Sequence, residues 1–382
     1  MRLNRGKFVG SLFLWFVLLN GLSAQNINIS LYNDKFVRSF VFTTANGTYN
    51  LNSPGSVKIT KLAHNDILYL TLVNQKVSAY HHGRNLGLFD SLVFEPSGTD
   101  DVFRIRSVSP SAEQRSYDEK LTVKVDFNRL LLVNTVSMDK YLAGVVETEG
   151  GPSTLPEFYK AQALLCRTYA LDNKYRHIEE GFNLCDGVHC QAYKGRNGSN
   201  TKILAAVKAT HSEVLIDENE ALITAAFHAN SGGITEDARN VWLIDLPYLK
   251  PVNDPFSLKG RQAEWKKEIT RDRWVKYLGD YDFYLKDAEK PGVFTMKTNG
   301  RERNYTIGLD HLPFTSIRKD WGLRSAYFSV IDNGENILLE GKGYGHGVGM
   351  SQEGAMQMAK AGYDYIDIIH YYFRNIEIIK LR

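Results

Sequence analysis

Glu149 lies at the end of a predicted amphipathic helix, in a position that could make its carboxyl group a general acid. From Met138 onward, apolar residues recur at i, i+3, i+4, i+7 and i+8, which is the spacing of an amphipathic helix. At 100° per residue, Glu149 falls within about 40° of this apolar stripe, whereas Glu147 points the other way. Burial and the negative end of the helix both raise the pKa of a carboxyl group, as general acid catalysis at neutral pH requires. The alternative for Glu149 is a solvated residue without a role at a fraying helix end.

Two cysteines and two histidines form a second group that could carry chemistry. His177, Cys185, His189 and Cys190 lie within a 14-residue stretch. Thiolate sulfur and imidazole nitrogen are ligands that Zn²⁺ prefers in tetrahedral sites. The alternative is a disulfide between Cys185 and Cys190, which an exported protein permits, with Cys166 buried as an apolar residue. The residues alone leave both interpretations open.

Two glycine-containing segments lie further along the chain, at 227–235 and 341–352. In the second segment, alternating glycines precede a predicted helix, as in a phosphate-binding loop. This segment lacks the Lys-Ser/Thr ending of a Walker motif and the βαβ setting of a dinucleotide site. We therefore expect these glycines to let the backbone pack closely against a neighbouring segment or a sugar.

The elements that must position these residues fall into two regions. Residues 25–128 contain short alternating strands separated by turn signals, which predicts an all-β module. The expected strands are 27–31, 35–42, 56–62, 67–72, 76–79, 102–108 and 120–127.

From residue 129 to 382 the pattern is mixed. After the helix that carries Glu149, Thr154 and Glu157 have the spacing of a capping box, with Pro156 in the first turn of a helix that extends to about Arg176. The predicted fold class is therefore α+β, an N-terminal all-β module followed by a mixed α+β core. The other elements expected in the core are helices at 201–209, 352–361 and 363–373 and strands at 213–216, 222–229 and 377–381.

The N-terminus and the charge balance indicate where the protein acts. Arg2, Arg5 and Lys7 precede the short apolar run 9–19, so residues 1–24 are predicted to be a secretory signal peptide. The alternative is an uncleaved membrane anchor, but the apolar run is short for a bilayer span, so cleavage is expected and no membrane span after it. Without these three basic residues, the 46 Lys and Arg become 43, against 43 Asp and Glu. A neutral exported protein is a poor nucleic-acid binder, and a glycan is the more natural partner.

Five stretches, in order along the chain, resemble the SpoIID/LytB family, named for stage II sporulation protein D and the amidase enhancer LytB. The resemblance covers about residues 120–382, and the family's usual N-terminal part is similar to the β-rich region before it. The matching stretches are MDKYLAGVVxxE at 138–149, KAQA with RTYA at 160–170, CDxxHCQxY at 185–193, FHxNSGG with VW at 227–242, and GYGHGVGMSQ at 343–352.

The resemblance implies an activity for Glu149. Family members are similar to lytic transglycosylases that cleave peptidoglycan strands between N-acetylmuramic acid and N-acetylglucosamine and leave 1,6-anhydro ends. The family's acidic residue falls on Glu149, and strands without stem peptides, called denuded strands, are the implied substrate. One departure is the segment 150–152, Gly-Gly-Pro, where the family commonly has Met-Pro. The alternative is a non-catalytic peptidoglycan-binding protein that enhances a cell-wall amidase, which would then be its partner.

The resemblance also implies ligands and glycan-binding residues. Members with the Cys-x-x-x-His-Cys pattern resemble zinc proteins, so His177, Cys185, His189 and Cys190 are expected to hold one structural Zn²⁺. The expected location is extracytoplasmic, in the periplasm or cell envelope. The residues expected to position the glycan are Gln162, Arg167, Tyr169, Gln191, Tyr193, Ser231, His346 and Gln352.

Overall fold

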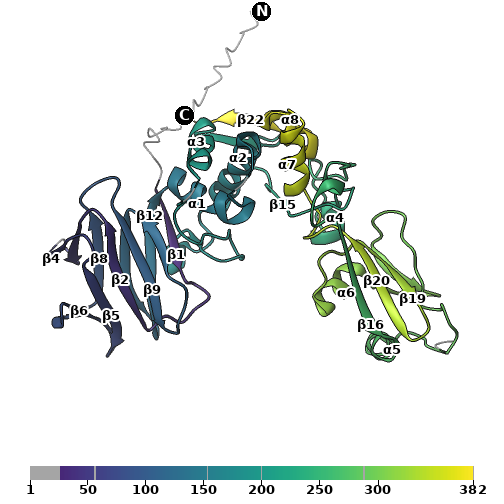
Figure 1. Cartoon of the computed structure of the whole chain (residues 1–382), viewed down its shortest axis with the longest axis horizontal. Coiled ribbons are helices and arrows are strands. Elements are labelled where there is room, and N and C mark those ends of the chain that lie inside the picture. Colours follow the sequence, from purple (N-terminus) through teal and green to yellow (C-terminus); the bar gives the residue numbers. More distant parts are fainter. Residues whose placement is uncertain (1–25, 56, 153, 199, 287–288, 382) are drawn as a thin grey trace, which may run out of the picture.

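The structure is a computed structural model that describes residues 26–55, 57–152, 154–198, 200–286 and 289–381. The predicted signal peptide, residues 1–24, lies outside the described residues. Within them, none of the helices has the length and apolarity to cross a membrane. The fold is α+β, as predicted, with a strand-rich region at the N-terminal end (Figure 1).

Two sheets form a β-sandwich at one end of the molecule (Figure 1). Their facing sides share one aromatic core, in which Phe42 stacks on Phe94 at 4.1 Å and on Phe103 at 5.5 Å between ring centroids. Burying one such side chain contributes about 1.5–3 kcal/mol. The first sheet has the order β13 (Leu184–Cys185), β1 (Asn26–Leu31), β12 (Arg129–Ser137), β11 (Lys120–Asp126), β8 (Ser91–Pro96), β3 (Tyr49–Ser53), β4 (Val57–Leu62), and the second the order β10 (Arg115–Asp118), β9 (Val102–Ser109), β2 (Ser39–Asn46), β5 (Ile67–Val73), β6 (Lys76–His81), β7 (Arg84–Phe89).

The first sheet extends beyond residue 128 and joins the sandwich to the rest of the chain. Strand β12 continues to Ser137, where α1 (Met138–Gly150) begins without a break. Strand β13, which ends at Cys185, pairs in parallel with β1 at the edge of the same sheet. The cysteine-containing segment is therefore fixed to the β-sandwich.

Helix α2 (Pro156–Asp172) is the centre of the helical region and packs against α1, α3 (Thr201–Ala209), α7 (Gln352–Lys360) and α8 (Tyr365–Tyr372). The predicted capping box is wrong. The residue before the helix is Leu155, which makes no side-chain cap, and Pro156 begins the helix. Proline suits this first position because its missing N–H would be unpaired there in any case. Behind α2, β14 (Glu213–Ile216) pairs with β22 (Glu377–Lys380).

The predicted strand 222–229 is reduced to β15 (Phe227–His228), which pairs in parallel with β21 (Met350–Ser351). This pairing brings the two glycine-containing segments together. At Gly349 the backbone has φ 72°, and a Cβ atom would lie 2.2 Å from the carbonyl oxygen of Ala226. Close backbone packing thus explains this glycine, as expected.

A second hydrophobic core lies at the opposite end of the molecule from the sandwich (Figure 1). It is centred on Trp274, Phe314 and Leu339 and is distinct from the core that joins the sandwich and the helices. Its elements are β16 (Glu264–Thr270), α5 (Arg271–Gly279), β17 (Asn304–Ile307), β18 (Asp310–Pro313), α6 (Phe314–Trp321), β19 (Phe328–Asp332) and β20 (Asn336–Lys342), and the short helix α4 (Ala238–Trp242) precedes them.

Candidate active site

Glu149 is half-buried near the C-terminal end of α1, as the helical pattern predicts. Its Oε1 accepts a hydrogen bond from the backbone N–H of Ala192 at 3.1 Å. Burial raises the pKa of Glu149, although the Ala192 hydrogen bond and the charge of Lys194 oppose this effect. A carboxyl group with a raised pKa is suited to donate a proton near neutral pH.

A pocket of about 550 Å³ opens in front of Glu149. Among the described residues that line it, Glu149 is the only carboxylate. Six segments contribute: the end of α1, α2, the cysteine-containing loop, the stretch 224–227, the end of α4 and the glycine-containing segment at 341–352. The lining residues are Glu149, Tyr169, Val188, His189, Cys190, Gln191, Thr224, Ala225, Ala226, Phe227, Trp242 and His346.

One glutamine is hydrogen-bonded to the backbone of Glu149, and a second glutamine is hydrogen-bonded to the first. The Gln352 amide donates to the carbonyl oxygen of Glu149 at 3.2 Å and to Oε1 of Gln162 at 3.3 Å. Gln162 is fully buried on α2, so these two predicted residues link α7, α2 and the end of α1. They support the position of Glu149 and do not line the pocket.

Three of the predicted glycan-positioning residues do line the pocket: Tyr169, Gln191 and His346. The Tyr169 hydroxyl accepts a hydrogen bond from Arg176 at 2.8 Å. Gln191 is held by the Tyr141 hydroxyl, which donates to its Oε1 at 3.2 Å. The structure thus brings residues from three separate stretches of the sequence to one cavity.

His346 is fixed as a neutral imidazole. Its Nε2 lies 2.9 Å from the carbonyl oxygen of Phe227 and so donates, and its Nδ1 accepts from the N–H of Val348 at 3.1 Å. Burial lowers the pKa of His346 to about 4. Both ring nitrogens are occupied, so His346 shapes the pocket and is not a second acid or base.

The structure does not bring Arg167, Tyr193 and Ser231 to this pocket. Arg167 is buried and donates to the carbonyl oxygens of Val207 and Glu213, which joins α2 to α3 and β14. The fully buried Tyr193 lies 5.1 Å from Tyr141 between ring centroids. The hydroxyl of Ser231 donates to Asp254 at 2.7 Å.

Sequence reasoning missed Trp242 as a site residue. Its ring lies 5.3 Å from that of His346 at the pocket wall, and 37% of its surface is exposed. An exposed aromatic ring at the pocket wall offers an apolar face for a sugar. The signal was present, because Val241 and Trp242 belong to one of the matching stretches, but nothing in the sequence places them beside His346.

The four predicted metal ligands meet at one point. Their ligand atoms all lie within 4.8 Å of one another. The Sγ of Cys190 lies 3.5 Å from Nε2 of His177 and 3.6 Å from Nδ1 of His189, and the Sγ of Cys185 lies 3.8 Å from the same His189 nitrogen. Tetrahedral zinc with ordinary bond lengths separates sulfur and nitrogen ligands by about 3.6 Å. The four side chains therefore fit the geometry of a Zn²⁺ site.

The surroundings of these residues also suit a metal. Nδ1 of His177 contacts the carboxylate of Glu180, which leaves Nε2 to face Cys190. A hydrogen bond between the two cysteines lowers the pKa of Cys190 and raises that of Cys185, and Arg176 also lowers the pKa of Cys190, so Cys190 is the thiol of the pair that ionises first. Thiolate is the form that binds zinc. The three cysteines are unpaired in the structure.

Comparison with known proteins shows the family of this chain. A family model described as SpoIID, stage II sporulation protein, matches residues 126–216. The chain is 33% identical over 262 residues to stage II sporulation protein D of Bacillus amyloliquefaciens, a match that covers 64% of this chain and 75% of that protein. The chain belongs to the SpoIID/LytB family.

Two further proteins that are similar to this chain differ in how much of it they match. An uncharacterised protein of Brachyspira hyodysenteriae is 26% identical over 349 residues, which covers 88% of this chain and 91% of that protein. The amidase enhancer of Bacillus subtilis is 28% identical over 285 residues, which covers 61% of this chain and 39% of that protein. The SpoIID/LytB relationship supports a function connected with the cell wall. The segment matched by the family model contains Glu149 and all four metal-ligand candidates.

Proposed function

We propose that this protein is an exported lytic transglycosylase that cleaves peptidoglycan strands with Glu149 as its single acid and base. The observation that carries this proposal is the half-buried Glu149 in a pocket whose described lining holds no second carboxylate. A glycoside hydrolase of the usual type needs two carboxylates, one on either side of the bond. An intramolecular reaction needs only one, because the substrate supplies its own nucleophile.

The reaction balances with Glu149 alone. The protonated carboxyl group donates its proton to the glycosidic oxygen as the bond from that oxygen to C1 of N-acetylmuramic acid breaks. The carboxylate then accepts the proton of the 6-hydroxyl, and O6 forms a bond to C1. The products are a 1,6-anhydro end and a free 4-hydroxyl, and Glu149 is protonated again.

The other pocket residues have supporting roles in this proposal. Trp242 offers a ring face for a sugar, and the neutral His346 fixes the loop beside it. The N–H of Ala192 stays hydrogen-bonded to Glu149 and stabilises the carboxylate that forms after the first proton transfer.

We further propose that His177, Cys185, His189 and Cys190 would hold one structural Zn²⁺. Four protein ligands leave no open position, so the ion would serve as a cross-link and activate no water. Val188, His189, Cys190 and Gln191 line the pocket, so the loop that the ion would fix is one of its walls.

The alternative function is that of a non-catalytic binding protein, and the name of the Bacillus subtilis amidase enhancer favours it. Both functions need affinity for glycan, but only the transglycosylase cleaves the glycan strand. Incubation of the mature protein with denuded strands, followed by mass analysis, decides between them. The transglycosylase proposal requires new 1,6-anhydro ends, and intact strands after prolonged incubation would favour the enhancer.

A further inference from the structure

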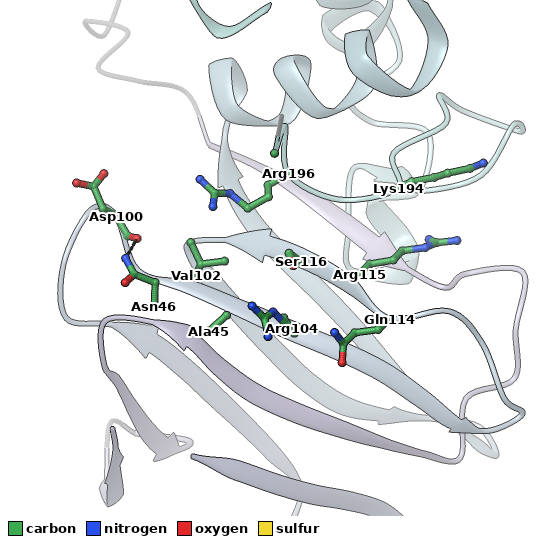
Figure 2. A pocket seen from close by; sticks show the side chains of 11 residues that line it. Ala45, Asn46, Asp100, Val102, Arg104, Gln114, Arg115, Ser116, Lys194 and Arg196 are labelled. Carbon is green, nitrogen blue, oxygen red and sulfur yellow. Dashed lines mark hydrogen bonds between the residues drawn. The ribbon is translucent and has the colours of Figure 1, made fainter. Parts of the chain in front are cut away.

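A basic groove of about 560 Å³ lies where the β-sandwich meets the loop after the predicted metal site (Figure 2). Four of its lining residues are cationic, and only one is anionic. Figure 2 shows Arg115 and Lys194 extending in the same direction on one side of the groove, with Arg196 on the other. The lining residues are Ala45, Asn46, Asp100, Val102, Arg104, Gln114, Arg115, Ser116, Lys194, Arg196 and Gly198.

Two of the cations are fixed by buried acids. Arg115 pairs with Asp186 at 2.9 Å, and Arg196 pairs with Asp118 at 3.2 Å. Both aspartates are largely buried, so these pairs hold the two guanidinium groups in place. The other two cations, on Arg104 and Lys194, are exposed, and neither has an ion-pair partner in the part of the chain that the structure describes.

The groove is built into the fold. The loop that carries Lys194 lies directly on β10, because the N–H of Arg196 donates to the carbonyl oxygen of Ser116 at 2.8 Å. Gly195 has φ 121°, and a Cβ atom there would lie 2.4 Å from the same oxygen. The sandwich and the loop are therefore in close contact along the groove.

One short segment joins the groove to the candidate active site. Ala192 donates its N–H to Glu149, and two residues later the charge of Lys194 lowers the pKa of the same carboxyl group. Lys194 also lines the groove, so the groove and Glu149 share one short segment of the chain.

We propose that this groove binds carboxylate groups of the glycan strand that reaches Glu149. The inference rests on the proposed function for its substrate class. Arginine and lysine form charge-assisted hydrogen bonds with carboxylates, and arginine can do so with two parallel bonds. N-acetylmuramic acid carries a lactyl carboxylate that is free in denuded strands, and stem peptides carry carboxylates of their own. A nucleic acid does not suit the neutral charge balance of the chain without its first 24 residues.

The test compares two double variants with equal charge change. Arg104→Gln with Lys194→Gln removes the two unpaired cations of the groove and leaves both buried ion pairs intact. Arg106→Gln with Lys208→Gln is the matched control, because Arg106 is exposed two residues further along β9, Lys208 is exposed on α3, and neither lines the groove. Both pairs are placed in a Glu149→Gln background so that no strand is cleaved during binding.

Three soluble ligands of equal length are titrated at low salt: denuded strands, peptide-bearing strands and neutral chitin oligosaccharides. For the groove variant we expect binding of carboxylate-bearing strands to weaken by about tenfold or more, and binding of chitin oligosaccharides to change by less than about twofold. The loss should shrink as ionic strength rises. The control variant should bind all three ligands as the parent does.

The outcomes show which carboxylates the groove binds and whether the groove proposal holds. A loss for denuded strands alone identifies the lactyl carboxylate, and a loss for peptide-bearing strands alone identifies stem-peptide carboxylates; both support the groove. Equal loss for chitin oligosaccharides, equal loss in the control, or no binding of any ligand by the parent overturns it. Because binding is measured without cleavage, a positive result stands even if the unmodified protein forms no anhydro ends.

Discussion

At the scale of single residues, Glu149 has the role that is most sharply defined. We expect Glu149→Gln to abolish anhydro product while glycan binding is retained, because the amide has nearly the same shape but cannot donate and reclaim a proton. Glu147→Gln is the control, since Glu147 accepts a hydrogen bond from the N–H of Gly198 outside the pocket and glutamine can still accept it. Mass analysis of digested denuded strands measures both. Equal loss in the two variants would contradict the assignment.

Glu149→Gln should also make the protein more stable. Burial raises the pKa of Glu149, so at neutral pH the folded state bears the cost of a partly buried carboxylate that the unfolded chain does not bear. Glutamine removes this cost, and we expect a higher Tm than that of the parent above the folded-state pKa. The difference should fade as the pH falls and the parent's carboxyl group becomes protonated. Thermal unfolding at several pH values tests this, and a lower Tm at neutral pH would show that the carboxylate stabilises the fold.

Lys194 should shift the pH above which the reaction slows, through its effect on the pKa of Glu149. The first step needs protonated Glu149, so kcat falls as pH rises through the pKa of this group. The charge of Lys194 lowers that pKa, so Lys194→Gln should move the falling limb of the kcat profile to higher pH. Lys208→Gln, on the exposed face of α3, is the control and should leave the limb in place. A shift in the opposite direction would exclude Glu149 as the titrating group.

Helix geometry and the family resemblance pointed to Glu149, and the resemblance alone pointed to Tyr169, Gln191 and His346; all four line the pocket. Sequence patterns could not separate these residues from Arg167 and others whose stretches are equally distinctive but whose side chains are buried elsewhere. Trp242 reaches the pocket wall through its contact with His346, a residue more than a hundred positions further along the chain. A local pattern carries no information of this kind.

At the scale of elements, the proposed zinc ion should hold the loop after β13 in its conformation. We expect one zinc per chain in protein purified without chelator, and three free thiols after denaturation. Cys185→Ser should remove the metal, lower the Tm and reduce activity by loosening one wall of the pocket. Cys166→Ala is the control, because Cys166 lies on α2 outside the ligand cluster and its loss should leave the zinc content unchanged. No metal and a single thiol would instead indicate a bridge between Cys185 and Cys190.

Long periodic elements were predicted well, and elements defined by distant partners were not. Helices α1, α3, α7 and α8 were expected at nearly their observed positions because each has a clear apolar face. Strands β3, β7, β8, β10 and β12 were missed or left unassigned, since strands gain much of their stability from neighbours in the sheet rather than from their own pattern. The second core was not separated from the first because no linker or change in composition marks its edges.

At the scale of the whole molecule, two hydrophobic cores suggest two units that unfold separately. Three of the tryptophans, Trp265, Trp274 and Trp321, lie in or against the second core, so tryptophan fluorescence mainly reports on it. The thiol of Cys166 is fully buried in the first core and reports on that core instead. The chain enters and leaves the second unit at adjacent positions, because Glu264 pairs with Lys342 in the β16–β20 register. Such a unit can open while the remainder stays folded.

Matched cavity variants test this independence. Leu339→Ala in the second core should destabilise that unit by about 2–5 kcal/mol, because a buried leucine is replaced by a cavity. We expect the fluorescence transition in urea to move to lower concentration while the Cys166 thiol becomes reactive at an unchanged concentration. Leu164→Ala, an equally buried site on α2, should produce the reverse pattern. The two units are in contact, because the Arg301 side chain donates hydrogen bonds to the carbonyl oxygens of Ser231 and Ile234. If both probes shift together in either variant, such contacts make the described chain unfold as one cooperative body.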